Sequence, residues 1–394
     1  MSRTKVVFSI GAMHGGGSER QMVSLLRNLD RDRFEPFLYL IYRSGPLLDE
    51  VPDDVKIISF EERFGPQRGP GFLMHRKRVA DMSRFFKEIR ADVSYDRTFL
   101  MTLITAEAAQ RVGVPNVSNI VTDPRVGFPQ VAGRWQWFKR RILRRLYQRS
   151  ALALANSEGA ARAAESFYGL EHGLVHVLHN GVDLEDVQSK AAEVVNDEWW
   201  NEASAKDKLV RIVTAGRLDD KKGFHLLIAA IDDLRNAHPN VELRLSILGE
   251  GPERESLQRQ ITAANLSKNV RLAGFQKNAP AWYRAADLFV LPSLLEGMPN
   301  VLLEAIACET PVLSADCESG PREILDSGRC GALCEPGSVR ALTQGIQKFL
   351  ADEELGSRYN SQAVPRLQEL FSIQSAVRKL ETHLLNAVGD DSRL

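Results

Sequence analysis

Short apolar runs alternate with segments of helical periodicity along most of the chain. The runs are rich in Val, Ile and Leu and have the length of strands; they cover residues 5–10, 91–95, 116–121, 151–156, 175–180, 209–216, 241–249, 269–275, 287–293 and 310–315. We expect helices between them, for example from about Ser18 and from about Thr98. Continuous rather than alternating apolar runs indicate strands that are covered on both faces, as in parallel sheets.

The alternation pauses between residues 185 and 208, where the sequence is polar and acidic. We therefore predict an α/β protein with two doubly wound, Rossmann-like domains in series. The predicted domains are residues 1–183 and 209–375, with a linker or insert at 184–208 and a final helix at 376–394. Ligands of such sheets bind beyond the carboxyl ends of the strands, so the loops there are the candidate sites.

Composition narrows the range of partners. The 51 basic and 51 acidic residues give a formal net charge of zero, which argues against a chain-wide nucleic-acid role. Four cysteines do not make a disulfide framework and favour a reducing, cytosolic compartment. Cys330 and Cys334 have a spacing that zinc sites sometimes use, but no histidine or second pair stands nearby, and we interpret them as small apolar residues. The sequence shows neither a membrane span nor a signal peptide.

The loop after the first predicted strand contains Gly15, Gly16 and Gly17. Glycines let the backbone approach a ligand, and the following helix directs unsatisfied amide groups at the same place, which suits a phosphate. The loop lacks the complete dinucleotide fingerprint, and no acid follows the second strand, so a nicotinamide or flavin cofactor is not expected. A tight turn without a ligand is the alternative.

The first strand of the second half runs into AGRLDDKKGFHLL. Arg217 leaves the end of this strand, and Lys222 stands just before Gly223 and a new helix, so one loop can direct both cations at one ligand. A planar guanidinium and a mobile ammonium together suit a diphosphate. Solvated surface cations are the alternative, and this loop alone does not decide between the two.

The stretch LLEGMPNVLLEAI holds two acids, Glu296 and Glu304, eight positions apart. Pro299 favours a helix start, so we expect Glu296 in the preceding loop and Glu304 about one turn into the helix. These acids can accept hydrogen bonds from two sets of hydroxyls, those of a sugar and those of a ribose, while a helix cap and a salt bridge are the alternative. The backbone amides expected around this entrance belong to Gly297, Met298, Asn300 and Val301.

Together these stretches resemble glycosyltransferase family 4, the retaining nucleotide-sugar transferases with the GT-B fold. The matching pieces occur in order from residue 16 to 325, and they are GGSER, NGVD, GRLDDKKG, GEGPER, LPSLLEGMPNVLLEAIACETPVLSAD and SGPREIL. Glu296 and Glu304, with seven residues between them, match the signature of the family. The second half of the chain is the more specific match.

The resemblance implies that the two domains face a central cleft, and that Arg217 and Lys222 neutralise the donor diphosphate without a metal. Glu296 would hold the hydroxyls of the transferred sugar and Glu304 those of the ribose. The last helix would cross back to the first domain. The remaining donor contacts that the resemblance implies are Gly16, Gly17, Gly249 in the GEGPE turn, Phe275, Gln276, Gly297, Met298, Asn300 and Val301.

Catalysis by Arg217, Lys222 and Glu296 would rest on stabilising charge on the leaving diphosphate and on an oxocarbenium-like sugar. The resemblance implies a front-face displacement in which the leaving phosphate oxygen takes the acceptor's proton and configuration is retained. The first domain departs from the family, because VTDPRVGF stands in the loop where a histidine commonly contacts the sugar. Asp123 and Arg125 of this loop would orient sugar or acceptor, or form a loop salt bridge.

The segment GRWQWFKRRILRRLYQR, residues 133–149, predicts a basic helix. Trp137 falls among arginines, a combination that suits the headgroup region of an anionic membrane. A helix that only packs and is solvated, and a polyanionic acceptor, are the alternatives. The stripe expected to face the core consists of Trp135, Phe138, Ile142 and Leu146, and the arginines around Trp137 are Arg140, Arg141 and Arg144.

The sequence thus predicts a hexosyltransferase that moves a hexose or N-acetylhexosamine from a nucleotide diphosphate sugar, with uridine as the expected nucleotide. The acceptor would be a glycan or a lipid-linked molecule in cell-surface polysaccharide or glycolipid assembly, and the enzyme would work in the cytoplasm, at the inner face of the plasma membrane. No metal, cofactor or nucleic acid is expected. One alternative is a GT-B epimerase or hydrolase, and another is a non-catalytic sugar-nucleotide or glycan-binding subunit, which would be expected to have lost Arg217, Lys222 or Glu304.

Overall fold

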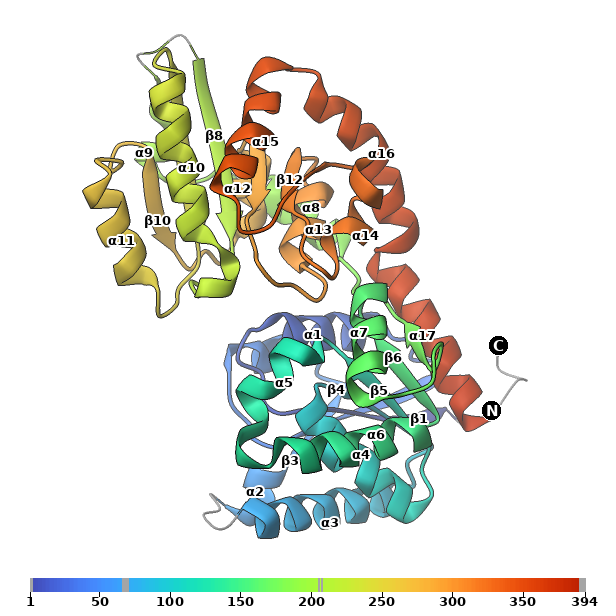
Figure 1. Ribbon diagram of the computed structural model, residues 1–394. Helices are drawn as coiled ribbons and strands as arrows, with labels where there is room; N and C mark the ends of the chain where they lie inside the picture. The colour runs from blue at the N-terminus through green and yellow to red at the C-terminus, as the bar shows by residue number, and fades with distance from the viewer. Residues whose placement is uncertain (1–2, 66–70, 205, 207, 390–394) are drawn as a thin grey trace. The chain divides into compact units, whose positions relative to one another are not determined.

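The computed structural model describes residues 3–65, 71–204, 206 and 208–389, and the chain forms two compact units (Figure 1). The first unit comprises Met1–Gly181 and Ile373–Leu394, and the second comprises Val182–Ser372. Residues 184–208, which the sequence predicts as a linker or insert, fall inside the second unit. Their apolar residues account for this, because Trp200 is fully buried and belongs to the same apolar cluster as Trp282.

The described residues of the first unit build a parallel sheet in the order β3-β2-β1-β4-β5-β6-β7. Its strands are β1 (Thr4–Ile10), β2 (Phe34–Leu40), β3 (Lys56–Ser59), β4 (Val93–Arg97), β5 (Asn116–Ile120), β6 (Leu152–Ala155) and β7 (Val175–Val177). Its helical segments are α1 (Gly17–Asn28), η1 (Pro46–Glu50), α2 (Phe60–Phe64), α3 (Gly71–Ile89), α4 (Phe99–Val112), α5 (Pro124–Ala132), η2 (Gly133–Trp135), α6 (Gln136–Arg149), α7 (Glu158–Tyr168) and α17 (Ile373–Val388).

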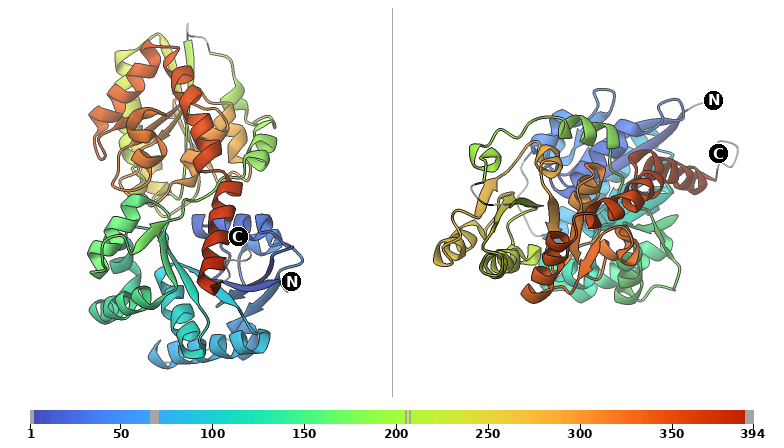
Figure 2. Two further views of the ribbon diagram at one scale, coloured as in Figure 1. Left: turned by 90° about the vertical axis from the view of Figure 1, so that its right-hand side faces the viewer. Right: turned by 90° about the horizontal axis from the view of Figure 1, so that it is seen from above.

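Strand β1 shows why the apolar runs of this unit are continuous. Phe8 packs in one apolar cluster with residues of α1 and α17, whereas the preceding Val7 packs in another with residues of α3 and α4. Figure 2 shows α17, which comes from the far end of the sequence, alongside the strands of the first unit. Both faces of the sheet are therefore covered, as the unbroken Val and Ile content predicts.

The second unit repeats this architecture with a parallel sheet in the order β10-β9-β8-β11-β12-β13 among its described residues. The strands are β8 (Lys208–Ala215), β9 (Val241–Leu248), β10 (Val270–Gly274), β11 (Leu288–Leu291), β12 (Val312–Ala315) and β13 (Ala332–Cys334). The helical segments are α8 (Leu184–Ala191), α9 (Glu198–Asn201), η3 (Asp220–Lys222), α10 (Phe224–Ala237), α11 (Arg254–Ala263), α12 (Ala279–Arg284), α13 (Asn300–Ala307), α14 (Pro321–Ile324), η4 (Asp326–Gly328), α15 (Val339–Ala351) and α16 (Leu355–Leu370).

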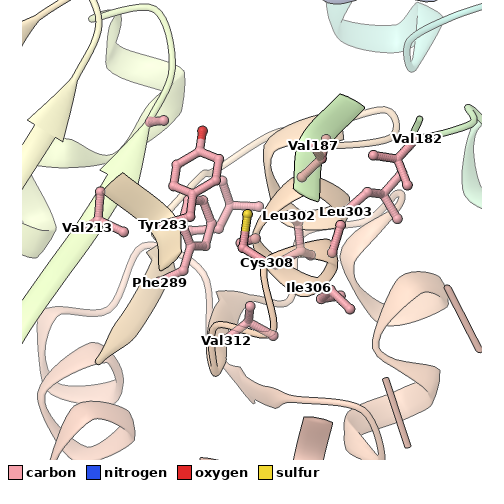
Figure 3. Packing of buried hydrophobic residues seen from close by; sticks show 14 of the residues in the cluster. Val182, Val187, Val213, Tyr283, Phe289, Leu302, Leu303, Ile306, Cys308 and Val312 are labelled. Atoms are coloured by element: carbon pink, nitrogen blue, oxygen red, sulfur yellow. The ribbon is translucent and has the colours of Figure 1, made fainter. Parts of the chain in front are cut away.

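Helix α13 is anchored in the core of the second unit. Figure 3 shows Leu302, Leu303 and Ile306 of this helix in one apolar cluster with Phe289 of β11 and Val312 of β12. All five side chains are at most 1% exposed. Each buried side chain of this size stabilises the fold by about 1.5–3 kcal/mol. This packing therefore holds α13, and with it the loop that precedes the helix, firmly in the core of the second unit.

Within the described part of the chain, no helix combines the length and the apolar content that crossing a membrane requires.

Candidate functional site

Loops at the carboxyl ends of neighbouring strands in the second unit are joined by backbone hydrogen bonds. The amide of Gly216, after β8, donates to Leu248 O (3.0 Å), and the amide of Gly249, after β9, donates to Gly274 O (2.7 Å). Gly249 has a φ of 139°, and a Cβ atom there would lie 2.0 Å from Gly216 O, so only glycine fits. The turns that carry GRLDDKKG and GEGPER therefore lie side by side.

Lys222 and Glu296, from two different loops, form an ion pair at this edge of the sheet. Lys222 ends η3, after β8, and its Nζ lies 2.6 Å from Oε1 of Glu296, which follows β11. Their side chains are only 22% and 9% exposed. Lys222, the residue predicted to bind the diphosphate, and Glu296, the residue predicted to bind the sugar hydroxyls, are thus adjacent, although 74 positions separate them in the sequence.

A second backbone contact holds these two loops together. Gly223 has a φ of 65°, and a Cβ atom there would lie 2.2 Å from Pro292 O. Two residues before Gly223, Lys221 O accepts a hydrogen bond from the amide of Leu294 (2.7 Å). The backbone at Gly223 therefore approaches the backbone at Pro292 more closely than any residue with a Cβ atom would allow, and this approach positions the neighbouring Lys222.

The environment fixes the charge of Lys222. Burial alone would lower the pKa of Lys222, but the Glu296 carboxylate, and beyond it Asp219, raise that pKa above its usual value. Lys222 is therefore an ammonium throughout the physiological range. Burial and then the Glu296 charge raise the pKa of the nearby Cys317 thiol to about 12, so this residue is a neutral thiol.

The other predicted cation, Arg217, and two of the predicted donor contacts, Phe275 and Gln276, also follow the carboxyl ends of strands in this sheet. Arg217 is exposed directly after β8 and forms no ion pair with any described residue. Phe275, after β10, is 64% exposed, and Gln276 is turned back, with Nε2 donating to Ala273 O (2.6 Å). A cation and an exposed aromatic ring are thus available beside the Lys222 loop.

Glu304 lies in α13, as the sequence predicts, and Pro299 is the residue before that helix. Burial and then the Glu304 charge raise the pKa of Cys308 to about 12. The SGPREIL loop closes on the helix entrance, because a Cβ atom at Gly320 (φ 90°) would lie 2.7 Å from Gly297 O. Gly297 and Met298 are buried, while Asn300 and Val301, the first residues of α13, are half-buried.

The first unit holds the remaining predicted site residues. Gly16 precedes α1, and Gly17 is its first residue. Asp123 caps α5 and is engaged by Arg125, whose Nη2 lies 2.6 Å from Asp123 Oδ2. Of the two alternatives for this pair, the structure contains the loop salt bridge.

The expected core-facing stripe of α6 is wrong at its beginning. Trp135 and Phe138 are 66% and 48% exposed, whereas the residues that α6 buries are Leu143, Leu146 and Tyr147. The reason is that Trp135 belongs to the turn η2 and only the later part of α6 packs in the core. Trp137 is 68% exposed, as expected.

Ser293 is a site residue that the motifs did not single out. It is fully buried, and its Oγ donates to Oε1 of Glu296 at 2.7 Å, the oxygen that Lys222 also contacts. The signal available in the sequence was a small polar residue between an apolar strand and the acid.

Comparison with known families assigns both halves of the chain. The family model described as Glycosyltransferase Family 4 matches residues 15–186. The model described as Glycosyl transferases group 1 matches residues 195–364. The two matches lie side by side along the chain and include both glutamates and both cations of the site.

Curated relatives and solved structures extend this result. The N-acetylgalactosamine-N,N'-diacetylbacillosaminyl-diphospho-undecaprenol 4-alpha-N-acetylgalactosaminyltransferase of Campylobacter jejuni is 28% identical over 380 residues, 94% of this chain and 96% of that protein. The putative glycosyltransferase EpsF of Bacillus subtilis is 27% identical over 80% of each chain. The structure of Anabaena Alr3699/HepE in complex with UDP superposes with a TM-score of 0.77 at 22% identity, covering 97% of this chain and 100% of that one. Sucrose-phosphate synthase from Thermosynechococcus elongatus superposes at 0.74 with 17% identity, covering 96% and 98%.

Proposed function

Because the chain belongs to glycosyltransferase family 4, and is a glycosyltransferase with the GT-B fold, we propose that it moves a hexose or N-acetylhexosamine from a uridine diphosphate sugar to a glycan or lipid-linked acceptor, with retention of configuration. The relative from C. jejuni, which is named for a diphospho-undecaprenol acceptor, supports a lipid-linked acceptor. The likeness to a fold solved with UDP supports the nucleotide.

The observation that carries the proposal is the contact between Lys222 and Glu296. In the reaction, the bond between the anomeric carbon and the diphosphate oxygen breaks, and the acceptor oxygen forms a new bond to that carbon on the same face. The leaving phosphate oxygen takes the acceptor's proton. Lys222 and Arg217 stabilise the negative charge on the departing diphosphate, and Glu296 accepts hydrogen bonds from the sugar hydroxyls.

A donor screen tests this proposal. Thermal stability and slow hydrolysis would be measured with uridine, guanosine and adenosine diphosphate sugars, with and without a chelator. We expect stabilisation by one uridine sugar that survives chelation, since two cations already face the diphosphate. Dependence on a divalent cation would contradict the metal-free mechanism, and silence with every donor would favour a non-catalytic subunit.

We further propose that the beginning of α6 binds an anionic membrane surface. Trp137 and Phe138 are exposed there, as are Trp135 at the end of η2 and Arg141 and Arg144 further along α6. Aromatic side chains anchor at the headgroup level, and arginines are attracted to anionic lipids. Trp137→Ala combined with Arg141→Glu should reduce sedimentation with anionic vesicles, and unchanged sedimentation would refute this proposal.

A further inference from the structure

Arg97 is a buried charge that has no oppositely charged partner among the described residues. Among the described residues, the charged residues that count as buried over backbone and side chain together are Asp81, Asp96, Arg97, Asp123, Glu165, Arg244 and Glu381. Four of them have an oppositely charged partner within 4 Å, and these pairs are Asp81–Arg63 (3.2 Å), Asp123–Arg125 (2.6 Å), Arg244–Glu242 (2.5 Å) and Glu381–Arg33 (3.6 Å). Glu165 contacts His172 (3.1 Å), which is a charged partner only when its imidazole is protonated. The exceptions are Asp96 and Arg97, which are consecutive residues of β4.

The two exceptions differ in how their charge can be removed. Asp96 accepts hydrogen bonds from Thr102, Asn116 and Ser118, and burial raises its pKa to about 6, so a proton can neutralise it. A guanidinium does not lose its proton in proteins. Arg97 has no such route to neutrality, and an unpaired buried charge is costly.

In the described part of the chain, the hydrogen bonds of Arg97 go to neutral oxygens. Its Nη1 donates to the hydroxyl of Tyr95 (3.3 Å) and its Nη2 to Oδ1 of Asn180 (3.0 Å), while its Nε has no partner among the described residues. Asn119, the residue paired with Arg97 on β5, has a buried Oδ1 that also lacks a partner there. Hydrogen bonds to neutral groups are about half as strong as those to ionised ones, so this arrangement is incomplete.

The position of Arg97 is one where doubly wound sheets bind ligands. Arg97 is the last residue of β4, and β4 lies next to β1 at the point where the strand order reverses. The following residue, Thr98, has a φ of 77°, which is unusual for a side chain branched at Cβ. Local strain of this kind gathers at functional sites, and ligands bind at the reversal point beyond the strand ends.

We propose that Arg97 is the centre of an oxyanion site in the first unit, one that takes a phosphate or carboxylate group of a substrate. On binding, the guanidinium exchanges the neutral oxygen of Asn180 for two oxygens of the anion, which match its planar fork. The amide groups of Asn180 and Asn119 are then donors for the remaining oxygens. Arg97 belongs to the first unit and Lys222 to the second, so this assignment does not depend on the role of Lys222.

The test is the thermal stability of the full chain during titration with inorganic phosphate, at ionic strength held constant with chloride. We expect a saturable rise in Tm, with each kcal/mol of binding free energy worth about 2–4 °C. Asn180→Asp supplies a carboxylate to Arg97 from within the fold. This variant should unfold at a higher temperature than the wild type without phosphate, and should lose the saturable rise. Arg97→Gln should also lose it.

Arg244→Gln is the matched control, since it removes a buried arginine that already has a carboxylate partner. It should lower Tm but keep the phosphate response. The general stabilisation by phosphate as an excluded salt is common to all variants and cancels between them. Equal responses in the wild type and in Asn180→Asp, or no saturable response in the wild type, would overturn the proposal. Parallel titrations with methyl phosphate and acetate separate a phosphate site from a carboxylate site, and the response to UDP reports the other unit independently.

Discussion

Glu296 has two contacts that compete with its proposed role. The carboxylate binds Lys222 Nζ (2.6 Å) and Ser293 Oγ (2.7 Å) through the same oxygen, which leaves its second oxygen for a sugar hydroxyl. A bound diphosphate would offer Lys222 a second anion. The pair in the ligand-free site therefore opposes diphosphate binding while it orients the acid.

This competition predicts opposite effects of Glu296→Gln on binding and on transfer. Loss of the carboxylate frees Lys222, so the affinity for uridine diphosphate should rise by roughly fivefold, corresponding to about 1 kcal/mol for a partly buried pair. Sugar transfer should fall, because the amide is a poorer acceptor for the sugar hydroxyls. Calorimetric titration and steady-state kinetics measure the two effects. The control Glu353→Gln breaks the exposed pair with Lys208 (2.7 Å) and should change neither. Weaker nucleotide binding by Glu296→Gln would refute the competition.

Asp96 gives the stability of the first unit a pH dependence. Burial raises its pKa from 3.8 to about 6, so between about pH 4 and pH 6 the folded protein binds more protons than the unfolded chain. From this group alone, the free energy of unfolding should fall by about 3 kcal/mol as the pH rises through that window. In Asp96→Asn this decline is absent, so the variant should gain stability relative to the wild type as the pH rises. Urea denaturation at pH 4 and pH 7.5 measures the difference, and parallel profiles would contradict the assignment.

Among the elements, the loop between β8 and α10 depends most on backbone fit. Gly223→Ala combines an unfavourable φ of 65° with a Cβ atom 2.2 Å from Pro292 O, so the loops that carry Lys222 and Glu296 must separate. We expect a loss of more than about 2 kcal/mol of unfolding free energy and a lower affinity for uridine diphosphate. Gly113→Ala has a similar φ, 77°, but no atom within 4 Å, and should cost only about 1 kcal/mol. Equal losses in the two variants, measured by chemical denaturation, would show that the close approach is unimportant.

At this scale, the sequence predicted elements better than their contacts. The apolar runs correctly placed strands such as β1 and β8, and the prediction of a GT-B fold is confirmed. The predicted buried stripe of α6 was wrong at its beginning and right at Leu146, because periodicity gives the phase of a helix but not which turns have a neighbour. Trp135 lies in the turn η2 and is 66% exposed, although its spacing from Phe138 suits a core stripe.

The candidate site shows the same limit. The sequence singled out Lys222 and Glu296 separately. Lys222 was a cation just before one helix, and Glu296 was an acid in the loop before another. Their direct contact depends on the order β8-β11 in the sheet, which no local pattern encodes. Arg97 escaped notice for a related reason. A buried arginine looks like any strand-end cation until its neighbours are known.

On the scale of the whole molecule, each unit has its own apolar clusters, and the chain passes between the units twice. The two crossing segments are tied locally. Gln21 of α1 holds both backbone groups of Gly181, accepting from its amide (3.0 Å) and donating to its carbonyl (2.7 Å). In the second unit, the amide of Val182 donates to Phe371 O (2.8 Å). The first unit is thus completed only by the last part of the sequence.

This discontinuity predicts an asymmetric response to truncation. A chain that ends at Ser372 lacks α17, which contributes Ile373, Val377, Leu380, Leu384 and Leu385 to the apolar core of the first unit. Their burial is worth on the order of 10 kcal/mol, comparable to the whole stability of a domain, so the first unit should not fold. The second unit keeps every contact of its own core and should keep its stabilisation by uridine diphosphate. Hydrogen exchange reports on the two units separately. In the shorter chain we expect fast exchange of the backbone amides in β1 and β4, and protected amides in β8 and α13. A control chain that ends at Gly389 retains α17 and should match the full protein. Protected β1 amides in the shorter chain would show that the first unit needs no closing helix.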